Sequence, residues 1–279
     1  MQNKTYSELF ELISGLAGVS DFSASEETFI LGFVNRRLYQ AYRSSSAWPR
    51  YIIGPLPRVS VNGLIPRSFT PTTQNISAAT RSNTKVTATL AGEPNFVVGM
   101  NVIIAGLSGT VTANGTFAVT SVEDNTFEYD LGAGTGSETY SGSGTVIAVA
   151  LPDIDSFNRI WDNNPLGTKG SREYDFWVDV GGAHVINPLP STYGYWVTAL
   201  KEFDGPYTTN STNIPQEFFQ WAAHAAYSDY LRLDRQTDKA LAEETVAQQF
   251  LVLELDKAQQ QSNNRLMWRI STHLSRQAR

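Results

Sequence analysis

The chain has 279 residues, of which 41% are hydrophobic and 17% charged, and its formal net charge is −6. This acidic balance argues against a general nucleic-acid binder, which carries a basic excess, although it leaves room for a small basic patch. The chain has no cysteine, which excludes disulfides, thiolate metal sites and a cysteine nucleophile. It has no apolar run of about 18 residues and no apolar signal core after Met1, so we expect a soluble protein made in a cytosol.

Two amphipathic helices are predicted within residues 5–46. The apolar side chains that recur at helical spacing are Tyr6, Leu9, Phe10, Ile13, Leu16 and Ala17 in the first, and Phe29, Ile30, Phe33, Val34, Leu38 and Ala41 in the second. Gly18 is placed to end the first helix, and Ser23 with Glu26 fits a capping box that begins the second.

Three arginines of the second helix lie off its apolar stripe as we assign it, namely Arg36, Arg37 and Arg43. Surface exposure is the default for charged side chains, so we expect a solvated face. The alternative is an electrostatic contact with a partner subunit.

Residues 47–67 are predicted to be extended. Four prolines, at positions 49, 55, 57 and 66, prevent a helix here. Asn62-Gly63 is flanked by alternating apolar residues, which is the strongest short-range signal for a hairpin turn.

Residues 68–150 are rich in Thr, Ser, Gly and Val and nearly free of Lys and Arg. Strands are predicted at 84–89, 97–106, 116–122, 126–131 and 145–150. Asn114-Gly115 is predicted to form a second hairpin turn, and Gly132–Gly144 a flexible loop. Several short strands with regular turn signals indicate a small β-barrel or sandwich.

Four stretches of this zone carry a resemblance to a known module: Ala79–Ala88, Val98–Val102, Asn114–Val119 and Thr126–Phe127. They resemble a small β-barrel that is inserted in many phage structural proteins. That module is similar to the first catalytic-cysteine half-domain fold of ubiquitin-activating enzymes. Because this chain has no cysteine, the resemblance implies the fold and not the chemistry.

Extended segments return after residue 151. A strand is predicted at 157–161, a hairpin at 173–186 and a long alternating strand at 195–203. We expect these segments and residues 47–67 to form one small sheet, which the β-module interrupts as an insertion. Aromatic side chains gather in these segments: Trp161, Trp177, Tyr195 and Trp196. We expect them to face a core or a neighbouring subunit; the alternative is a platform for stacking sugars or bases.

The last third is predicted to form two helices, at about 215–233 and 238–261. Pro215 suits the first helical position, where no hydrogen bond is lost. One apolar face follows it at helical spacing, consisting of Phe218, Trp221, Ala222, Ala225, Ala226 and Tyr230. Its small alanines let another helix approach closely, and it bears no reactive group. We therefore interpret it as a packing surface.

No catalytic or metal-binding constellation is predicted. His184, His224 and His273 each lack a second histidine or a carboxylate at ligand spacing. Two carboxylate pairs, Asp153 with Asp155 and Asp175 with Asp179, lack the glycine-containing loop spacing of a cation site. We therefore expect no cofactor, no metal and no enzymatic activity.

The C-terminal segment 262–279 is predicted to be a binding arm. A polar break at 259–264 precedes it, and Asp256 is the last acidic residue of the chain. The residues expected to contact a neighbour are Arg265, Leu266, Trp268, Arg269, Ile270, Leu274 and Arg276. We expect apolar anchors in a protein groove with arginines at its rim. A disordered, solubilising tail is the alternative.

The whole layout resembles a head-to-tail adaptor (connector or head-completion) protein of tailed bacteriophages. The features that carry it are the N-terminal helical pair, the small sheet, Ile214–Phe218 opening a long helix, Asp238–Ala240 opening the next, and the charged C-terminus. The fold class expected is α+β: a helical bundle with a small antiparallel sheet, interrupted by an all-β barrel or sandwich. The expected domains are 1–67 with 151–261, the insertion 68–150 and the arm 262–279.

The resemblance implies a virion structural protein that forms a ring, typically twelve-fold, beneath the portal. Its partners are copies of itself, the portal and a tail or nozzle protein, and DNA passes through its lumen, without specific binding, during genome ejection. It is assembled in the host cytoplasm and does not bind a membrane. The rival hypothesis is a tail-associated glycan-binding module that uses the β-domain, favoured by the Thr/Ser/Gly-rich barrel and the tryptophans.

Overall fold

The computed structural model describes residues 2–20, 22–189 and 192–277, and of residues 192 and 262–277 it describes the backbone alone. The fold is α+β, with helices and antiparallel sheets that include a β-barrel. The chain divides into two compact units. Met1–Ile52 and Phe203–Arg279 form the first, which we call the helical unit, and Ile53–Glu202 forms the second, the β unit.

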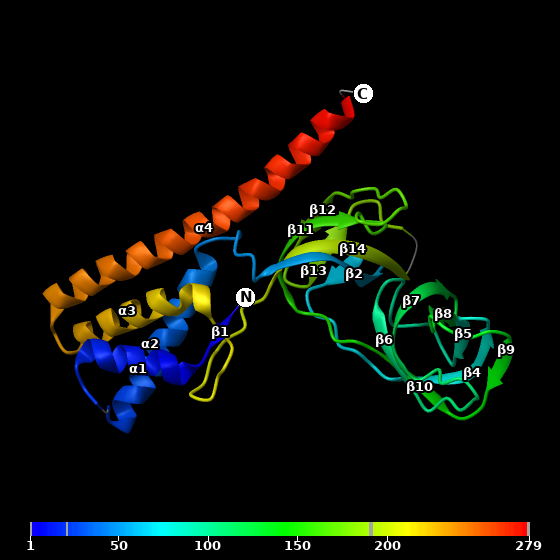
Figure 1. Ribbon diagram of the computed structural model, residues 1–279, viewed down its shortest axis with the longest axis horizontal. Coiled ribbons are helices and arrows are strands. Elements are labelled where there is room, and N and C mark those ends of the chain that lie inside the picture. Colours follow the sequence, from blue (N-terminus) through cyan, green and yellow to red (C-terminus); the bar gives the residue numbers. More distant parts are fainter. Residues whose placement is uncertain (1, 21, 190–191, 278–279) are drawn as a thin grey trace. The chain divides into compact units, whose positions relative to one another are not determined.

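The helical unit contains all the helices in the described part of the chain (Figure 1). Its elements are β1 (Asn3–Lys4), α1 (Tyr6–Ala17), α2 (Ala24–Arg43), β15 (Ile214–Pro215), α3 (Gln216–Leu233) and α4 (Thr237–Gln277). The short strands β1 and β15 pair in antiparallel fashion, so the start of the chain is tied to the start of α3.

The predicted helix ends of the N-terminal pair are confirmed. Gly18 ends α1 in the left-handed conformation, at φ 70°, which costs a glycine nothing sterically. Ser23 and Glu26 form the predicted capping box of α2. A second capping box, between Thr5 and Glu8, begins α1 and went unpredicted, although the Thr-x-x-Glu spacing is its usual signature.

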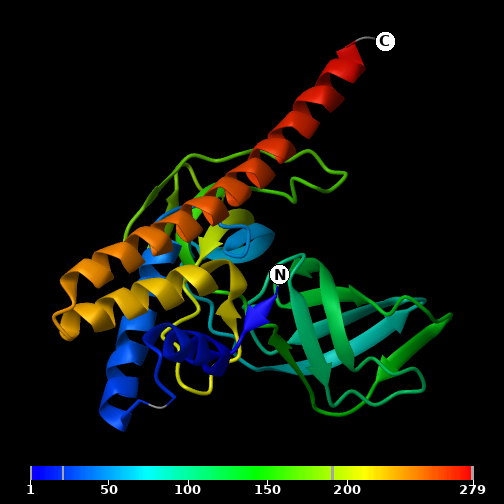
Figure 2. The same ribbon diagram turned by 60° about the vertical axis from the view of Figure 1, so that its left-hand side comes forward.

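Helix α3 lies at the centre of the helical unit. It packs against α1, α2 and α4, and Figure 2 shows it between α4 and the N-terminal pair. Pro215 is the N-cap of α3 and not its first helical residue, because its extended ψ of 125° serves the pairing with Asn3 in β1. The expected position of this proline is therefore wrong by one residue.

Helix α4 is 41 residues long and folds back along α3 (Figure 1). At about 1.5 Å per residue it spans roughly 60 Å. The predicted break at 259–264 is wrong, since the helical backbone runs through it to Gln277. The segment contains neither glycine nor proline, and glutamine is a good helix former, so polarity alone does not end the helix.

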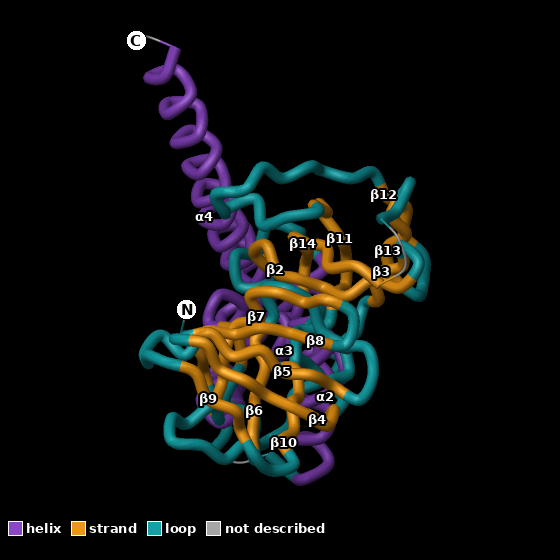
Figure 3. The backbone as a smooth tube through the Cα atoms, turned by 90° about the vertical axis from the view of Figure 1, so that its right-hand side faces the viewer, coloured by secondary structure: helices purple, strands orange, loops and turns teal. Residues whose placement is uncertain are grey.

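Seven strands of the β unit form a closed barrel (Figure 3). They are β4 (Gln74–Ser82), β5 (Lys85–Leu90), β6 (Asn101–Ala105), β7 (Gly115–Glu123), β8 (Thr126–Asp130), β9 (Ser137–Tyr140) and β10 (Gly144–Ala148). The order is β10-β6-β7-β8-β5-β4-β9, and β10 also pairs with β4, which closes the barrel. Its interior is filled by apolar side chains such as Val86, Val102 and Phe127.

Two local predictions within the barrel are wrong. Asn114-Gly115 is not a tight hairpin turn, because a longer loop joins β6 to β7 and Gly115 already belongs to the strand. The Asn114 side chain closes that loop by bonding the backbone N and O of Leu107 at 3.0 and 2.7 Å. The expected loop Gly132–Gly144 contains strand β9, which pairs with β4.

The remaining strands of the β unit form a six-stranded sheet. They are β2 (Ile52–Val61), β3 (Leu64–Pro66), β11 (Ile154–Trp161), β12 (Phe176–Val178), β13 (Gly182–Val185) and β14 (Thr192–Lys201), in the order β11-β14-β2-β3-β13-β12. The sheet combines strands from both sides of the barrel sequence, as predicted. Asn62 and Gly63, at φ 52° and 81°, make the predicted turn between β2 and β3.

The boundary between compact units differs from the domain boundaries expected from the sequence. From the sequence we expected the six-stranded sheet to belong to the same domain as the helices, whereas the sheet forms one compact unit with the barrel. The barrel and the sheet pack closely at two glycines, Gly99 against the Trp196 ring and Gly194 against Val97. A Cβ added to Gly99 would lie 2.5 Å from the Trp196 ring, and one added to Gly194 would lie 2.7 Å from Val97.

Candidate functional site

The predicted packing face of α3 lies inside the helical unit. Phe218, Trp221, Ala222, Ala225 and Ala226 are buried, and Tyr230 is partly exposed with its hydroxyl donating to Glu26 Oε1 at 2.8 Å. The alanines allow the close approach of neighbouring helices, which their sequence spacing suggested. These side chains are used by contacts within the chain itself.

Aromatic rings and a tryptophan hydrogen bond fix the orientation of α3. The Phe218 ring lies edge-on to Trp48, with centroids 4.8 Å apart, and parallel to Tyr51 at 6.2 Å. Trp221 Nε1 donates to the backbone oxygen of Arg37 at 3.1 Å, so the central helix is bonded directly to α2.

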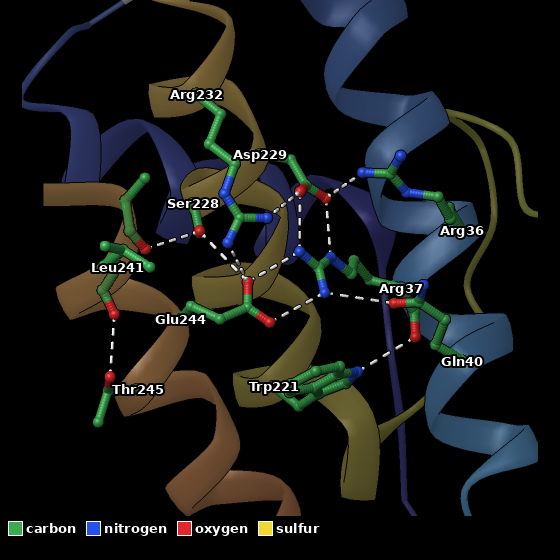
Figure 4. A network of polar contacts seen from close by, with 11 residues as sticks. Arg36, Arg37, Gln40, Trp221, Ser228, Asp229, Arg232, Leu241, Glu244 and Thr245 are labelled. Carbon is green, nitrogen blue, oxygen red and sulfur yellow. Dashed lines mark hydrogen bonds and ion pairs between the residues drawn. The ribbon is translucent and has the colours of Figure 1, made fainter. Parts of the chain in front are cut away.

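A buried ion-pair network joins α2, α3 and α4 (Figure 4). Arg37 Nε and Nη2 donate to the two carboxylate oxygens of Asp229, each at 2.8 Å. Its Nη2 and Nη1 also donate to Glu244 Oε2 and Oε1, at 2.8 and 3.1 Å. Arg36 pairs with Asp229 from the solvent side, and Arg232 reaches Asp229 and Glu244 at 3.4 Å. The network thus holds three guanidinium groups and two carboxylates.

The prediction that Arg37 lies on a solvated face is wrong. Its side chain is 9% exposed, whereas that of Arg36 is 55% exposed. Burial alone would lower the pKa of Arg37, but its bonds to Asp229 and Glu244 outweigh burial and raise that pKa. Burial would raise the pKa of Asp229, and the bonds from Arg37 and Arg36 instead hold it below its ordinary value. Both groups are therefore charged in the folded protein.

The positions of Arg37 and Asp229 along their helices would have been enough to predict this network from the sequence. Arg37 follows Ile30 and Val34 at seven and three residues, so it falls on the buried stripe of α2. Asp229 likewise follows Ala225 at four residues on the apolar face of α3. A charge on the buried stripe of each of two helices indicates a buried pair, because neither charge is stable there alone.

The outer surface of the helical unit bears several large apolar side chains. On α4, Ala240, Ala247 and Leu251 are buried, whereas Leu241, Val252 and Leu253 are 58%, 52% and 55% exposed. Other exposed apolar residues of this unit are Val19 after α1, Phe29 and Tyr39 on α2, and Leu233 at the end of α3. Isolated exposed apolar residues are normal. Leu241 and Val252 lie about three turns apart on the same side of α4, whereas Leu253 lies on another side.

The predicted arm residues lie outside the residues whose side chains the structure describes. They are Arg265, Leu266, Trp268, Arg269, Ile270, Leu274 and Arg276, and the same holds for His273. The backbone of this segment continues α4 as far as Gln277. The contacts expected of the arm therefore stay a prediction.

The two described histidines each bond a single carboxylate. His184 Nε2 lies 2.9 Å from Asp179 Oδ2, and its ring stacks on Trp177 with centroids 3.9 Å apart. His224 Nδ1 lies 2.8 Å from Glu243 Oε2. Asp179 also accepts from the backbone of Gly181 and Gly182, which lowers its pKa after the larger effect of His184. Among the residues that the structure describes, no group of three potential ligands could hold a metal ion.

The predicted aromatic group is divided by the sheet. Tyr195 is fully buried in the sheet core, and Trp161 and Trp196 are partly buried. Trp177 is 53% exposed and stacked on His184. The sheet thus does not assemble one shared platform from the four rings, because alternate positions of β14 face opposite sides.

Comparison with protein-family models and with curated proteins finds no match to this chain. Over the described residues, no helix combines the length and the apolar character needed to cross a membrane.

Proposed function

We propose that this chain is a virion structural protein, the head-to-tail adaptor of a tailed bacteriophage. Copies form a ring beneath the portal, connect capsid to tail and let DNA pass through the lumen without specific binding. The observation that carries the proposal is α4, whose 41 residues extend well past the 18 residues of α3. A helix of that reach, anchored on a tightly packed helical core, suits a protein that bridges two larger assemblies.

The helical core supports a structural role and no reaction. Its buried charges pair with one another in the network around Arg37, Asp229 and Glu244, which joins three helices. A ring under internal DNA pressure needs such rigidity between elements. We accordingly propose a helical-bundle adaptor without catalytic activity or cofactor.

The ring contact belongs on the outer faces of α4 and α2, because α3 is enclosed by the other helices. A head-to-tail ring needs two different surfaces on each copy that fit one another. Leu241 and Val252, which lie about three turns apart on the same side of α4, offer one apolar surface, and Phe29 with the half-exposed Arg36 of α2 offers the other. Asp256 of α4, which is exposed, can pair with such an arginine of the neighbouring copy.

The charge balance of the chain fits a conduit for DNA. Phosphate neutralisation by lysine and arginine makes DNA binding tight, which opposes rapid passage. A formal net charge of −6 avoids that. The segment 262–279, which carries four arginines and no acidic residue, is proposed to reach the portal, in the virion assembled within the host cytoplasm.

Negative-stain imaging and mass measurement of the purified chain, alone and with its cognate portal ring, test this proposal. A ring, or a stacked complex on the portal, is expected. Val252→Glu should prevent ring formation and leave the fold intact, and Val178→Glu serves as the matched control because Val178 is an exposed valine of the β unit. Deletion of 262–279 should leave a folded protein that no longer docks. A monomer that ignores the portal would refute the adaptor function.

A further inference from the structure

The β unit contains an open cleft of about 470 Å³ between the barrel and the six-stranded sheet. Its lining includes Glu93 and Asp124 from the barrel side, and Asp162, Lys169 and Trp196 from the sheet side. Ligand sites for small molecules are concave and commonly measure about 300–1,000 Å³. The cleft is thus large enough for a small molecule or for part of a longer one.

The walls of the cleft are held in place by close packing. The segment before β6 supplies one wall and the start of β14 the other. They meet where Val97 lies against Gly194 and the Trp196 ring against Gly99, both too close for an added Cβ. Gly99 has a φ of 90°, so two independent constraints require glycine there. A preformed site loses little conformational entropy on binding.

Polar side chains in the cleft have unused hydrogen-bonding capacity. In the described part of the chain, the side chains of Glu93, Asp124 and Lys169 have no hydrogen bond or ion pair. Asp162 uses Oδ1 to accept from the backbone N of Arg172 at 2.8 Å, which leaves Oδ2 for another donor. Ser121 adds a hydroxyl that can both donate and accept. Asn163 donates to the backbone oxygen of Gly170 and keeps its Oδ1 and one N–H, and Thr120 Oγ1 donates to the backbone oxygen of Glu128 and can still accept.

Two partly buried aromatic residues also line the cleft, Tyr193 and Trp196. Tyr193 packs edge-on against Tyr195, with ring centroids 5.3 Å apart. Burial raises the pKa of Tyr193, and the nearby charge of Asp162 raises it further, so its hydroxyl stays protonated at neutral pH. An amphipathic aromatic wall beside carboxylates and amides is therefore available to a ligand.

We propose that this cleft binds a neutral oligosaccharide. A pyranose ring presents C–H groups on its face, which pack on an aromatic side chain, and hydroxyls around its rim, which both donate and accept. The carboxylates of Glu93, Asp124 and Asp162 would accept from those hydroxyls, and Lys169 would donate to a ring or hydroxyl oxygen.

Other ligand classes fit the lining less well. Three carboxylates oppose the single ammonium group of Lys169, so a phosphate or a uronate would be repelled. A fully apolar ligand would remove the carboxylates from water without giving them donors, which is costly. Both the barrel and the sheet contribute side chains to the lining of the cleft, so the isolated barrel would lack the side chains that the sheet supplies.

The test uses the full chain and isothermal titration calorimetry. The probes are neutral di- and tetrasaccharides built from glucose, galactose and N-acetylglucosamine, with polygalacturonate as the anionic comparison. We expect binding of at least one neutral sugar with a Kd at or below about 1 mM. Trp196→Ala should weaken it about tenfold or more, and Trp177→Ala, which removes an exposed tryptophan outside the cleft, should leave it unchanged.

Because Trp196 packs on Gly99, its replacement could reduce binding by disturbing the fold, and a second variant separates the two effects. Glu93→Gln combined with Asp124→Asn changes exposed side chains alone and should weaken binding at least several-fold, with Glu11→Gln, at an exposed position of α1, as the matched control. The proposal is overturned by the absence of binding to every neutral probe at about 10 mM. It is equally overturned by a preference for polygalacturonate, or by binding that the cleft variants leave unchanged. None of these outcomes depends on ring assembly.

Discussion

Replacement of Asp229 by alanine should strongly destabilise the helical unit. The Asp229 side chain is 5% exposed and accepts two bonds of 2.8 Å from Arg37, whose own side chain is 9% exposed. Without the carboxylate, a buried guanidinium group keeps Glu244 as its main partner. Breaking a buried ion pair by removing one member costs about 3–5 kcal/mol. Because Glu244 remains, we expect about 3 kcal/mol, in the lower part of that range.

Thermal unfolding followed by circular dichroism at 222 nm, where helices dominate the signal, measures this effect. A loss of about 3 kcal/mol corresponds to a decrease in Tm of roughly 10 °C for a unit of this size. Glu11→Ala is the control, since Glu11 is exposed on α1, and the free energy of unfolding of this variant should differ from that of the original chain by no more than about 0.5 kcal/mol.

A triple variant separates the loss of a partner from the loss of a favourable pair. Arg37→Met with Asp229→Leu and Glu244→Leu replaces the two buried charges and the partly buried Glu244 by apolar side chains of similar volume. Such replacements are often neutral or stabilising, so the triple variant should recover most of the stability lost in Asp229→Ala. The reasoning is refuted if Asp229→Ala melts together with the control, or if the triple variant is less stable than Asp229→Ala.

Three further predictions concern pH, packing and a turn. The pKa of Asp229 is lower in the folded protein than its ordinary value of 3.8, so ionised Asp229 stabilises the fold fully above that value, and this contribution is lost as the pH falls through the folded-state pKa. The Tm of the helical unit should therefore decrease below about pH 4, and it should decrease less steeply in the Asp229→Asn variant. Ala225→Trp should overpack the fully buried face of α3 at a cost of about 1–3 kcal/mol or more, and native-like stability in denaturant titration would show that α3 is not closely packed there. Gly63→Ala should cost about 1–2 kcal/mol, because φ is 81° and the added Cβ would lie 2.6 Å from Pro188 Cβ; an unchanged Tm of the β unit would contradict this.

Local signals predicted the elements whose ends depend on a few neighbouring residues. Gly18, the capping box of Ser23 with Glu26, and the Asn62-Gly63 turn all satisfy backbone requirements within a few positions, so their sequence suffices. The same is true of the alternating strands of the barrel. Asn114-Gly115 shows the limit of such signals, because the Asn114 side chain bonds Leu107, seven residues away, and forms a different loop.

The candidate sites depended on contacts between distant residues. Arg37 is separated by 192 residues from Asp229, and only the packing of α2 against α3 brings the two charges together. The cleft likewise joins Glu93 to Trp196, and its volume exists because Gly99 and Gly194 let the barrel approach the sheet.

The sequence by itself determined the α+β class, the absence of cysteine chemistry, the sheet formed from both sides of the barrel segment, and most helix and strand positions. Only the tertiary structure decided that Arg37 is buried, that α4 runs without a break through the polar segment 259–264, and that the barrel and sheet enclose a cleft. The physical reason is that propensity, capping and turn chemistry act over a few residues, whereas burial and pairing depend on which surfaces meet.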